Sequence, residues 1–103
     1  MIRTVFRLHE NRLTGFSVKG HSGTAAIGSD IVCAAVSSAA YMTVNTLTEI
    51  IGLQPEIEVR DGYLHCFLTE ENDSARDLFA GFRLHMEDLA SQYPKAIKIT
   101  TEE

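Results

Sequence analysis

A histidine and a cysteine in the first third of the chain have the residue types and the spacing for nucleophilic chemistry. His21 follows a predicted strand, and Cys33 comes twelve residues later, in the first turn of a predicted helix. Cysteine reacts as the thiolate, which a helix N-terminus and a nearby imidazole both favour. A strand end and the next helix start lie side by side when the connecting loop folds back, which would bring imidazole within reach of the thiol. The two residues therefore predict a nucleophile and its base.

Two further polar residues near Cys33 are candidate supporting groups. Asp30 could accept a hydrogen bond from the second ring nitrogen of His21, as the third member of a triad does, or it could cap the helix. A carboxylate so close to Cys33 would also disfavour the thiolate. Ser37 lies four residues after Cys33 and so on the same helix face. It could contact the thiolate or a substrate, or bond back to the Cys33 carbonyl.

The segment between the two candidate catalytic residues is predicted to be a substrate loop. Residues 22–28 are small and uncharged, and the loop includes or adjoins Gly20, Ser22, Gly23 and Gly28. Glycine permits positive φ angles and close approach of a peptide backbone. The amides of the loop and of the helix start could form an oxyanion hole. Plain loop flexibility would explain the same glycines.

Each candidate also has a structural explanation, and other kinds of site are not indicated. Cysteine is often a buried small hydrophobe, and a histidine beside glycine is often a surface residue. The histidines and cysteines lack standard metal-ligand spacing, which argues against a metal site. No glycine-rich phosphate-binding motif is present, so we expect no cofactor. Cys66 alternates with Leu64 and Leu68 and is predicted to be buried.

The composition indicates one cytoplasmic domain covering residues 1–103. The hydrophobic fraction of 45% and the charged fraction of 22% are typical of a globular protein. The net charge of −5 argues against direct nucleic-acid binding, which needs a basic face. We find no export signal and no continuous apolar run of membrane-spanning length. Two cysteines without an export signal suggest reduced thiols.

The strands are predicted from alternating side chains and turn signals. In Ile2–Leu8, residues Ile2, Thr4, Phe6 and Leu8 share one face. A polar turn at His9–Arg12 leads to a second strand over Leu13–Gly20. Asp61-Gly62 is a type I′ hairpin signal. It joins two more strands, over Glu56–Arg60 and Tyr63–Leu68, and the last predicted strand is Ala96–Thr101.

Two helices complete the predicted order ββαββαβ. The first runs from Ile31 to about Ile51, with Ser29 or Asp30 as its N-cap and Gly52 ending it. The second covers Asp73–Tyr93, capped near Asn72 or Asp73, with apolar residues at helical spacing and Pro94 after its end. This order predicts an α+β fold with two helices packed on one face of a largely antiparallel sheet.

The motif around the candidate nucleophile resembles the signature of the ribosomal-processing cysteine protease family, called Prp. The matching residues are Gly20-His21, Gly28 and Asp30-Ile31-Val32-Cys33-Ala34-Ala35-Val36-Ser37. The resemblance implies a catalytic dyad of His21 and Cys33, supported by Asp30 and Ser37. Ser22 stands where the family pattern suggests alanine.

The resemblance also implies a substrate and an oligomeric state. Prp proteases remove a short N-terminal extension from large-subunit ribosomal protein twenty-seven, so that extension would be the partner of this chain. The family implies a homodimer and a loop between histidine and cysteine that orders around substrate. Two other functions stay open: a non-enzymatic ribosome-associated or assembly protein, and a redox-sensing thiol domain. The latter would lack a nearby resolving cysteine if Cys66 is buried.

Overall fold

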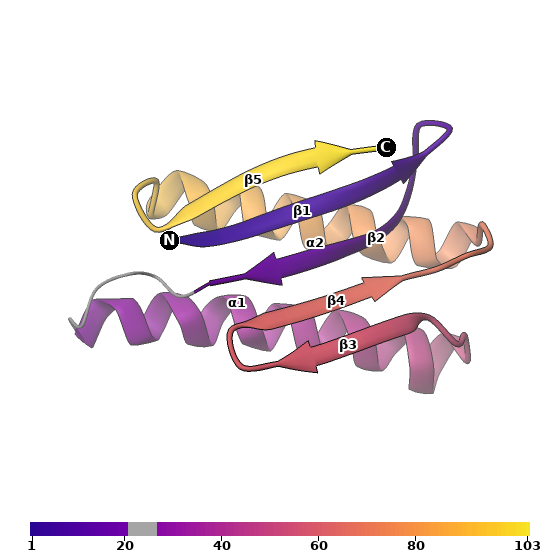
Figure 1. The fold of residues 1–103 in the computed structure, drawn as a ribbon, viewed down its shortest axis with the longest axis horizontal. Coiled ribbons are helices and arrows are strands. Elements are labelled where there is room, and N and C mark those ends of the chain that lie inside the picture. Colours follow the sequence, from indigo (N-terminus) through magenta and orange to yellow (C-terminus); the bar gives the residue numbers. More distant parts are fainter. Residues whose placement is uncertain (21–26) are drawn as a thin grey trace.

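The protein forms a five-stranded sheet covered on one face by two helices (Figure 1). The computed structural model describes residues 1–20 and 27–103, with side chains described from residue 31 onward in the second range. The elements are β1 (Ile2–His9), β2 (Arg12–Lys19), α1 (Ile27–Asn45), a π-helical segment η1 (Thr46–Ile51), β3 (Glu56–Arg60), β4 (Tyr63–Phe67), α2 (Asp73–Gln92) and β5 (Ile97–Glu102). The predicted order ββαββαβ is confirmed.

The sheet has the strand order β3-β4-β2-β1-β5. The pairs β1–β2, β2–β4 and β3–β4 are antiparallel, and β1–β5 is parallel. The prediction of a largely antiparallel sheet is therefore confirmed. Figure 1 shows both helices behind the sheet, so the front face of the sheet carries no helix.

The core fills the space between the sheet and the two helices. Ile2, Thr4 and Phe6 of β1 are buried, as their alternation predicts. Phe16 of β2 packs against Phe6 and also against aromatic rings of α2. The buried side chains of α2 are Ala75, Phe79, Phe82, Met86 and Leu89, and those of the α1–η1 helix include Val32, Val36, Ala40, Val44 and Leu47. Burial of these apolar side chains is the main favourable term for the fold.

The two hairpin turns differ in backbone conformation, and the predicted type I′ conformation occurs in the other turn. Both Glu10 and Asn11 have positive φ angles, 51° and 65°, which is the sign pattern of a type I′ turn. In the Asp61-Gly62 turn only Gly62 has a positive φ, 68°. The hairpin between β3 and β4 is confirmed, but its predicted type I′ turn is wrong. Tertiary pairing of the strands determines the turn more than the residue pair does.

The start of α1 corrects the predicted cap. The helix begins at Ile27, so Ser29 and Asp30 lie inside its first turn and neither is the N-cap. The loop predicted to reach Gly28 is correspondingly shorter at this end. The N-cap of α2 is confirmed, because the Asn72 side chain accepts a hydrogen bond from the Ala75 amide at 2.9 Å.

The far end of the first helix widens before it stops. The hydroxyl of Thr46 donates to the Met42 carbonyl at 2.7 Å, and that of Thr48 donates to the Val44 carbonyl at 3.2 Å. Such bonds compete for the carbonyls that the helix itself uses, which is a physical reason for the π-helical geometry here. Gly52 then ends the helix with a φ of 82°, and its amide donates to the Leu47 carbonyl. The predicted glycine stop is confirmed.

The first helix is unusually apolar for a helix that is only partly covered. Residues 31–51 have a mean hydropathy of 1.3, which together with their length would suffice to cross a membrane, although only 33% of the helix is buried. The sequence has no continuous apolar run there, since threonines and serines interrupt it. One side of this helix packs on the sheet, as a core helix does.

Gly15 of β2 should be intolerant of any side chain. A Cβ at this position would lie 2.4 Å from the Cys66 carbonyl oxygen and 2.8 Å from the Phe67 Cα, both backbone atoms of the paired strand. We expect Gly15→Ala to lower the free energy of unfolding by about 1–3 kcal/mol, measured by urea denaturation. Gly81→Ala in α2 is the control: nothing lies within 4 Å of its Cβ, so it should stabilise by about 0.5–1 kcal/mol. Equal effects of the two substitutions would contradict this account.

Burial of Cys66 should make stability fall at alkaline pH. Its side chain is fully buried, and desolvation raises the pKa of the Cys66 thiol from 9.0 to about 11. Because the unfolded chain releases this proton more readily, the contribution is fully present below about pH 9 and is lost as the pH rises through about 11. The stability difference between wild type and Cys66→Ala should shrink by up to about 2–3 kcal/mol over that range. If urea denaturation gives the same stability difference between the two proteins at every pH, this prediction is contradicted.

Candidate active site

A pocket of about 250 Å³ opens between α1 and one end of the sheet. One wall is a single side of α1, where Cys33, Ser37 and Tyr41 follow one another at four-residue intervals. The opposite wall comes from the first residue of β1, the end of β2 and the β3–β4 turn. Besides these three α1 residues, the whole pocket is lined by Ile2, Val18, Gly20, Val36, Ala40, Arg60, Asp61, Gly62, Tyr63 and Leu64.

Cys33 lies at the rim of this pocket and is half-buried. It packs against the edge of the hydrophobic core. Because α1 begins at Ile27, Cys33 lies in the second turn of the helix, so its predicted place in the first turn is wrong. The helix macrodipole acts mainly within the first turn, so it stabilises a thiolate here less than the sequence suggested. A nearby base therefore matters more for activating this thiol.

Gly20 ties the end of β2 to the pocket in a conformation that only glycine supports well. Its φ is 96°, and a Cβ there would lie 2.5 Å from the Met1 carbonyl oxygen. Its amide donates to the Gly62 carbonyl at 2.8 Å, which joins the end of β2 to the β3–β4 turn. The chain therefore leaves β2 at the wall opposite Cys33, in agreement with the predicted proximity of the strand end and the helix.

The structure brings together three of the predicted site residues: Gly20, Cys33 and Ser37. Gly28 and Asp30 lie in the first turn of α1, but their side-chain surroundings are not among the described parts of the chain. His21, Ser22 and Gly23 lie outside the described residues. The predicted dyad, oxyanion hole and substrate loop therefore stay predictions.

Sequence reasoning missed one side of the pocket. Tyr41 could have been found, since it continues the four-residue spacing of Cys33 and Ser37. Arg60, Asp61 and Tyr63 carried no such signal. They reach the pocket only because β4 pairs with β2, and this strand order is not apparent from local patterns.

The second cysteine belongs to the core, as predicted. Cys66 faces the helices from β4, is fully buried, and is not among the pocket residues. Its neighbour His65 points to the open face of the sheet, where its ring stacks on Phe67. Successive strand residues face opposite sides, so these two potential metal ligands diverge. Within the described residues, the grouping His9, Glu10 and Glu71 could hold an ion, but it is exposed and lies outside the pocket.

Comparison with known proteins agrees with this fold. A family model described as "Cysteine protease Prp" matches residues 1–98. The chain is 27% identical to the ribosomal processing cysteine protease Prp of Bacillus subtilis, over 95% of this chain and 94% of that protein.

Solved structures are similar over almost the whole chain. A Streptococcus mutans protein, SMU.848, is 30% identical with a TM-score of 0.80, covering 99% of this chain and 96% of that one. The Staphylococcus aureus protease Prp, in complex with a covalently linked product peptide, is 26% identical with a TM-score of 0.84, covering 99% and 100%. With a family match over nearly all of its length and the same fold, this chain belongs to the Prp family of cysteine proteases.

Proposed function

We propose that this protein is an endopeptidase that removes the N-terminal extension of large-subunit ribosomal protein twenty-seven. Cys33 would be the nucleophile, and His21 the general base and acid. The observation that carries the proposal is the pocket that has Cys33 on one wall and, on the other, the residue preceding His21. The B. subtilis relative is named a ribosomal processing protease, and an S. aureus relative binds a covalently linked product peptide.

The pocket has the character of a peptide-binding site. Its floor is apolar, formed by Ile2, Val18, Val36, Ala40 and Leu64. Polar groups lie around it, including the exposed Ser37 and Asp61. Ligand sites commonly combine an apolar interior with a few polar groups that fix orientation. A substrate side chain would enter the pocket while its backbone lies along the side of α1 that carries Cys33.

The reaction would proceed through an acyl-enzyme. His21 accepts the Cys33 proton, and the sulfur attacks the scissile carbonyl carbon to form a C–S bond. Backbone amides stabilise the oxyanion, and His21 gives its proton to the amine as the C–N bond breaks. Water then loses a proton to His21 and attacks the acyl carbon, and breakage of the C–S bond restores the thiol. This chemistry needs no cofactor.

Supporting roles go to Asp30 and Ser37. Asp30 would hold the imidazole of His21 in the useful orientation, as a triad carboxylate does. Ser37 lies one helical turn beyond Cys33, is exposed and lines the pocket, so it would contact the substrate. We place the activity in the cytoplasm, because the two cysteines suit a reducing compartment.

Cleavage of a peptide spanning the extension tests the proposal. Wild type should make a single cut, read by mass spectrometry, and Cys33→Ala and His21→Ala should each reduce the rate by roughly 10³-fold or more. Cys66→Ala is the matched control: it removes the chain's other thiol, away from the pocket, and should retain cleavage at a temperature where it is folded. Cleavage by Cys33→Ala would contradict the assigned nucleophile.

Thiol reactivity separates this function from the two alternatives. An active Cys33 should be alkylated by iodoacetamide at neutral pH, while the buried Cys66 should not react in the native protein. Slow alkylation of Cys33, together with no loss of function in Cys33→Ala, would favour a non-enzymatic binding protein. Reversible oxidation of Cys33 without cleavage would favour a redox role.

We also propose that the protein acts as a homodimer, through the outer side of its two helices. An apolar groove of about 670 Å³ lies between α1 and α2, with Ala35, Met42, Leu78 and Phe82 among its lining residues. The α1 helix is as apolar as a membrane span yet is only 33% buried. A helix apolar on all sides is normally covered. A second copy would present the same groove and helix, as a two-fold interface requires.

Substitution in the groove tests the dimer. Met42 is 63% exposed and lines the groove, so Met42→Glu should shift the protein to monomer in sedimentation-velocity experiments. Ile50→Glu is the control, because Ile50 is 80% exposed but does not line the groove. A wild-type monomer, or equal weakening by both substitutions, would overturn this interface.

A further inference from the structure

The open face of the sheet carries a row of cations that crosses all five strands. The strand pairings place Arg3 directly beside Lys98 of β5 on one side and Lys19 of β2 on the other. Lys19 pairs with Tyr63, which pairs with Arg60 at the opposite edge. The row Lys98–Arg3–Lys19–Tyr63–Arg60, called the basic row here, contains four of the nine lysines and arginines. Its four steps span about 19 Å.

This arrangement opposes the stability of the sheet. Like charges directly opposite each other on neighbouring strands are destabilising, and Arg3 has such a neighbour on both sides. Arg3, Lys19 and Lys98 are exposed and make no ion pair with any residue that the structure describes. Only Arg60 has an acidic partner, Glu58, at 3.0 Å. An anionic partner would relieve this repulsion.

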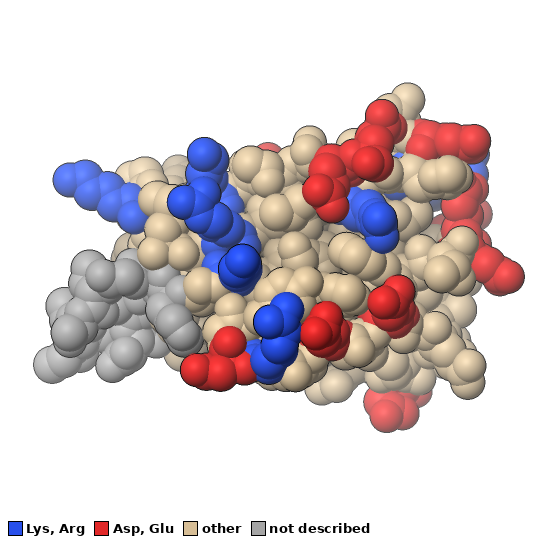
Figure 2. Space-filling model, viewed as in Figure 1, with Lys and Arg blue, Asp and Glu red and all other residues tan. Residues whose placement is uncertain are grey.

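The net charge of −5 conceals this face. The expectation of no direct nucleic-acid binding rested on the sum of charges, whereas the strand register gathers cations in one row. Figure 2 shows most blue side chains gathered at the end of the open face where the N-terminus lies and most red ones elsewhere, although red side chains flank the lowest blue one. A ligand with repeated negative charge would therefore lie across the strands at one end of the face, along the basic row, and would not cover the whole face.

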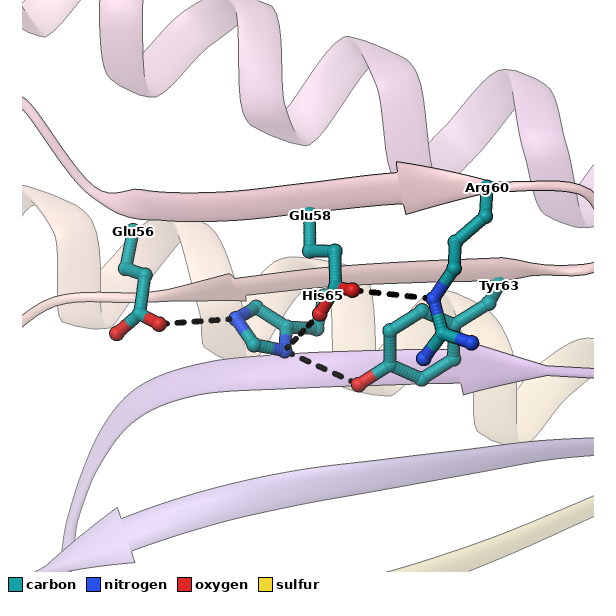
Figure 3. A network of polar contacts seen from close by, with 5 residues as sticks. All are labelled: Glu56, Glu58, Arg60, Tyr63 and His65. Carbon is teal, nitrogen blue, oxygen red and sulfur yellow. Dashed lines mark hydrogen bonds and ion pairs between the residues drawn. The ribbon is translucent and has the colours of Figure 1, made fainter.

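Aromatic and guanidinium groups that can stack on bases lie in the basic row and next to it along β4. The Arg60 guanidinium lies 4.3 Å from the centre of the Tyr63 ring, and the Tyr63 hydroxyl contacts His65 Nδ1 at 3.0 Å (Figure 3). His65 in turn stacks on Phe67, with ring centres 4.5 Å apart. Guanidinium planes and aromatic rings both stack on unpaired bases. An acidic peptide would need the cations but would have no use for these flat groups.

The carboxylates on this face set its limit. Glu56 and Glu58 of β3 lie on either side of His65, at 3.7 and 4.0 Å from its ring nitrogens (Figure 3). These two carboxylates repel a phosphate chain from the part of β3 and β4 that lies beyond the basic row. A strand of RNA is thereby restricted to the basic row, with its bases directed toward Tyr63 and Arg60.

We propose that the basic row binds single-stranded RNA, with Arg3, Lys19, Lys98 and Arg60 contacting phosphates and the Arg60–Tyr63 pair stacking on a base. The flat open sheet, the line of cations and the adjoining aromatic rings together form the combination on which single-stranded nucleic acid binds. Arg3, Lys19 and Lys98 do not line the candidate active site, whereas Arg60 and Tyr63 lie on its wall. RNA binding is therefore tested apart from peptide cleavage by changing only Arg3 and Lys98.

Fluorescence anisotropy with a labelled oligouridylate tests the proposal on the intact wild-type protein. The logarithm of the association constant should fall with the logarithm of salt concentration with a slope of about −2 to −3, as expected for four phosphate contacts on a single strand. Arg3→Gln with Lys98→Gln should weaken binding about 10- to 30-fold at roughly 0.1 M salt and reduce the slope by about 1 to 2. Cleavage of the extension peptide should be unchanged in this variant.

The matched control removes two cations from elsewhere. Arg12→Gln with Arg83→Gln makes the same change in net charge outside the basic row and should bind RNA as wild type does. Equal loss in both variants, or a wild type that does not bind the oligouridylate, would overturn the proposal. Tighter binding to polyglutamate of equal charge would also overturn it and assign the surface to an acidic protein. RNA binding that persists in Cys33→Ala keeps this result independent of the protease assignment.

Discussion

The close approach of Gly20 to the first residue of the chain is the constraint on which the site depends. With a φ of 96° and no room for a side chain beside the Met1 carbonyl, Gly20 fixes the direction in which the chain leaves β2. Its hydrogen bond to Gly62 holds the β3–β4 turn against that exit. Together with the pairing of β2 and β4, this junction places the β3–β4 turn on the wall opposite Cys33.

The two cysteines show how the fold gives one residue type two different chemistries. Cys66 faces inward from a central strand, where desolvation raises its pKa to about 11 and keeps it a neutral packing group. Cys33 lies on a helix side that is open to a pocket. The difference comes from what each side chain faces: Cys66 points from β4 into the core, and Cys33 points from α1 toward the pocket.

Local patterns predicted most of the elements but not how they meet. Alternation in β1 and the apolar spacing of α2 reproduce the observed burial, because each element packs one face on one core. The start of α1 was misplaced, because Ser29 and Asp30 have the residue types of a cap yet lie within the helix. The contribution of Asp61 and Tyr63 to the pocket, and the basic row, arise from pairings between distant strands. Such pairings depend on the whole fold.

The parallel pairing of β1 with β5 has a consequence for how the protein is made. Ile2 pairs with Ile97, so one edge of β1 has no hydrogen-bonding partner until β5, some ninety residues later, has been synthesised. Until β5 arrives, the amides and carbonyls along that edge of β1 are available to other chains, which is the usual route to aggregation. Contacts so distant along the sequence also slow folding. The nascent chain therefore carries this open sheet edge until β5 has been synthesised, and a chain truncated before β5 would keep it.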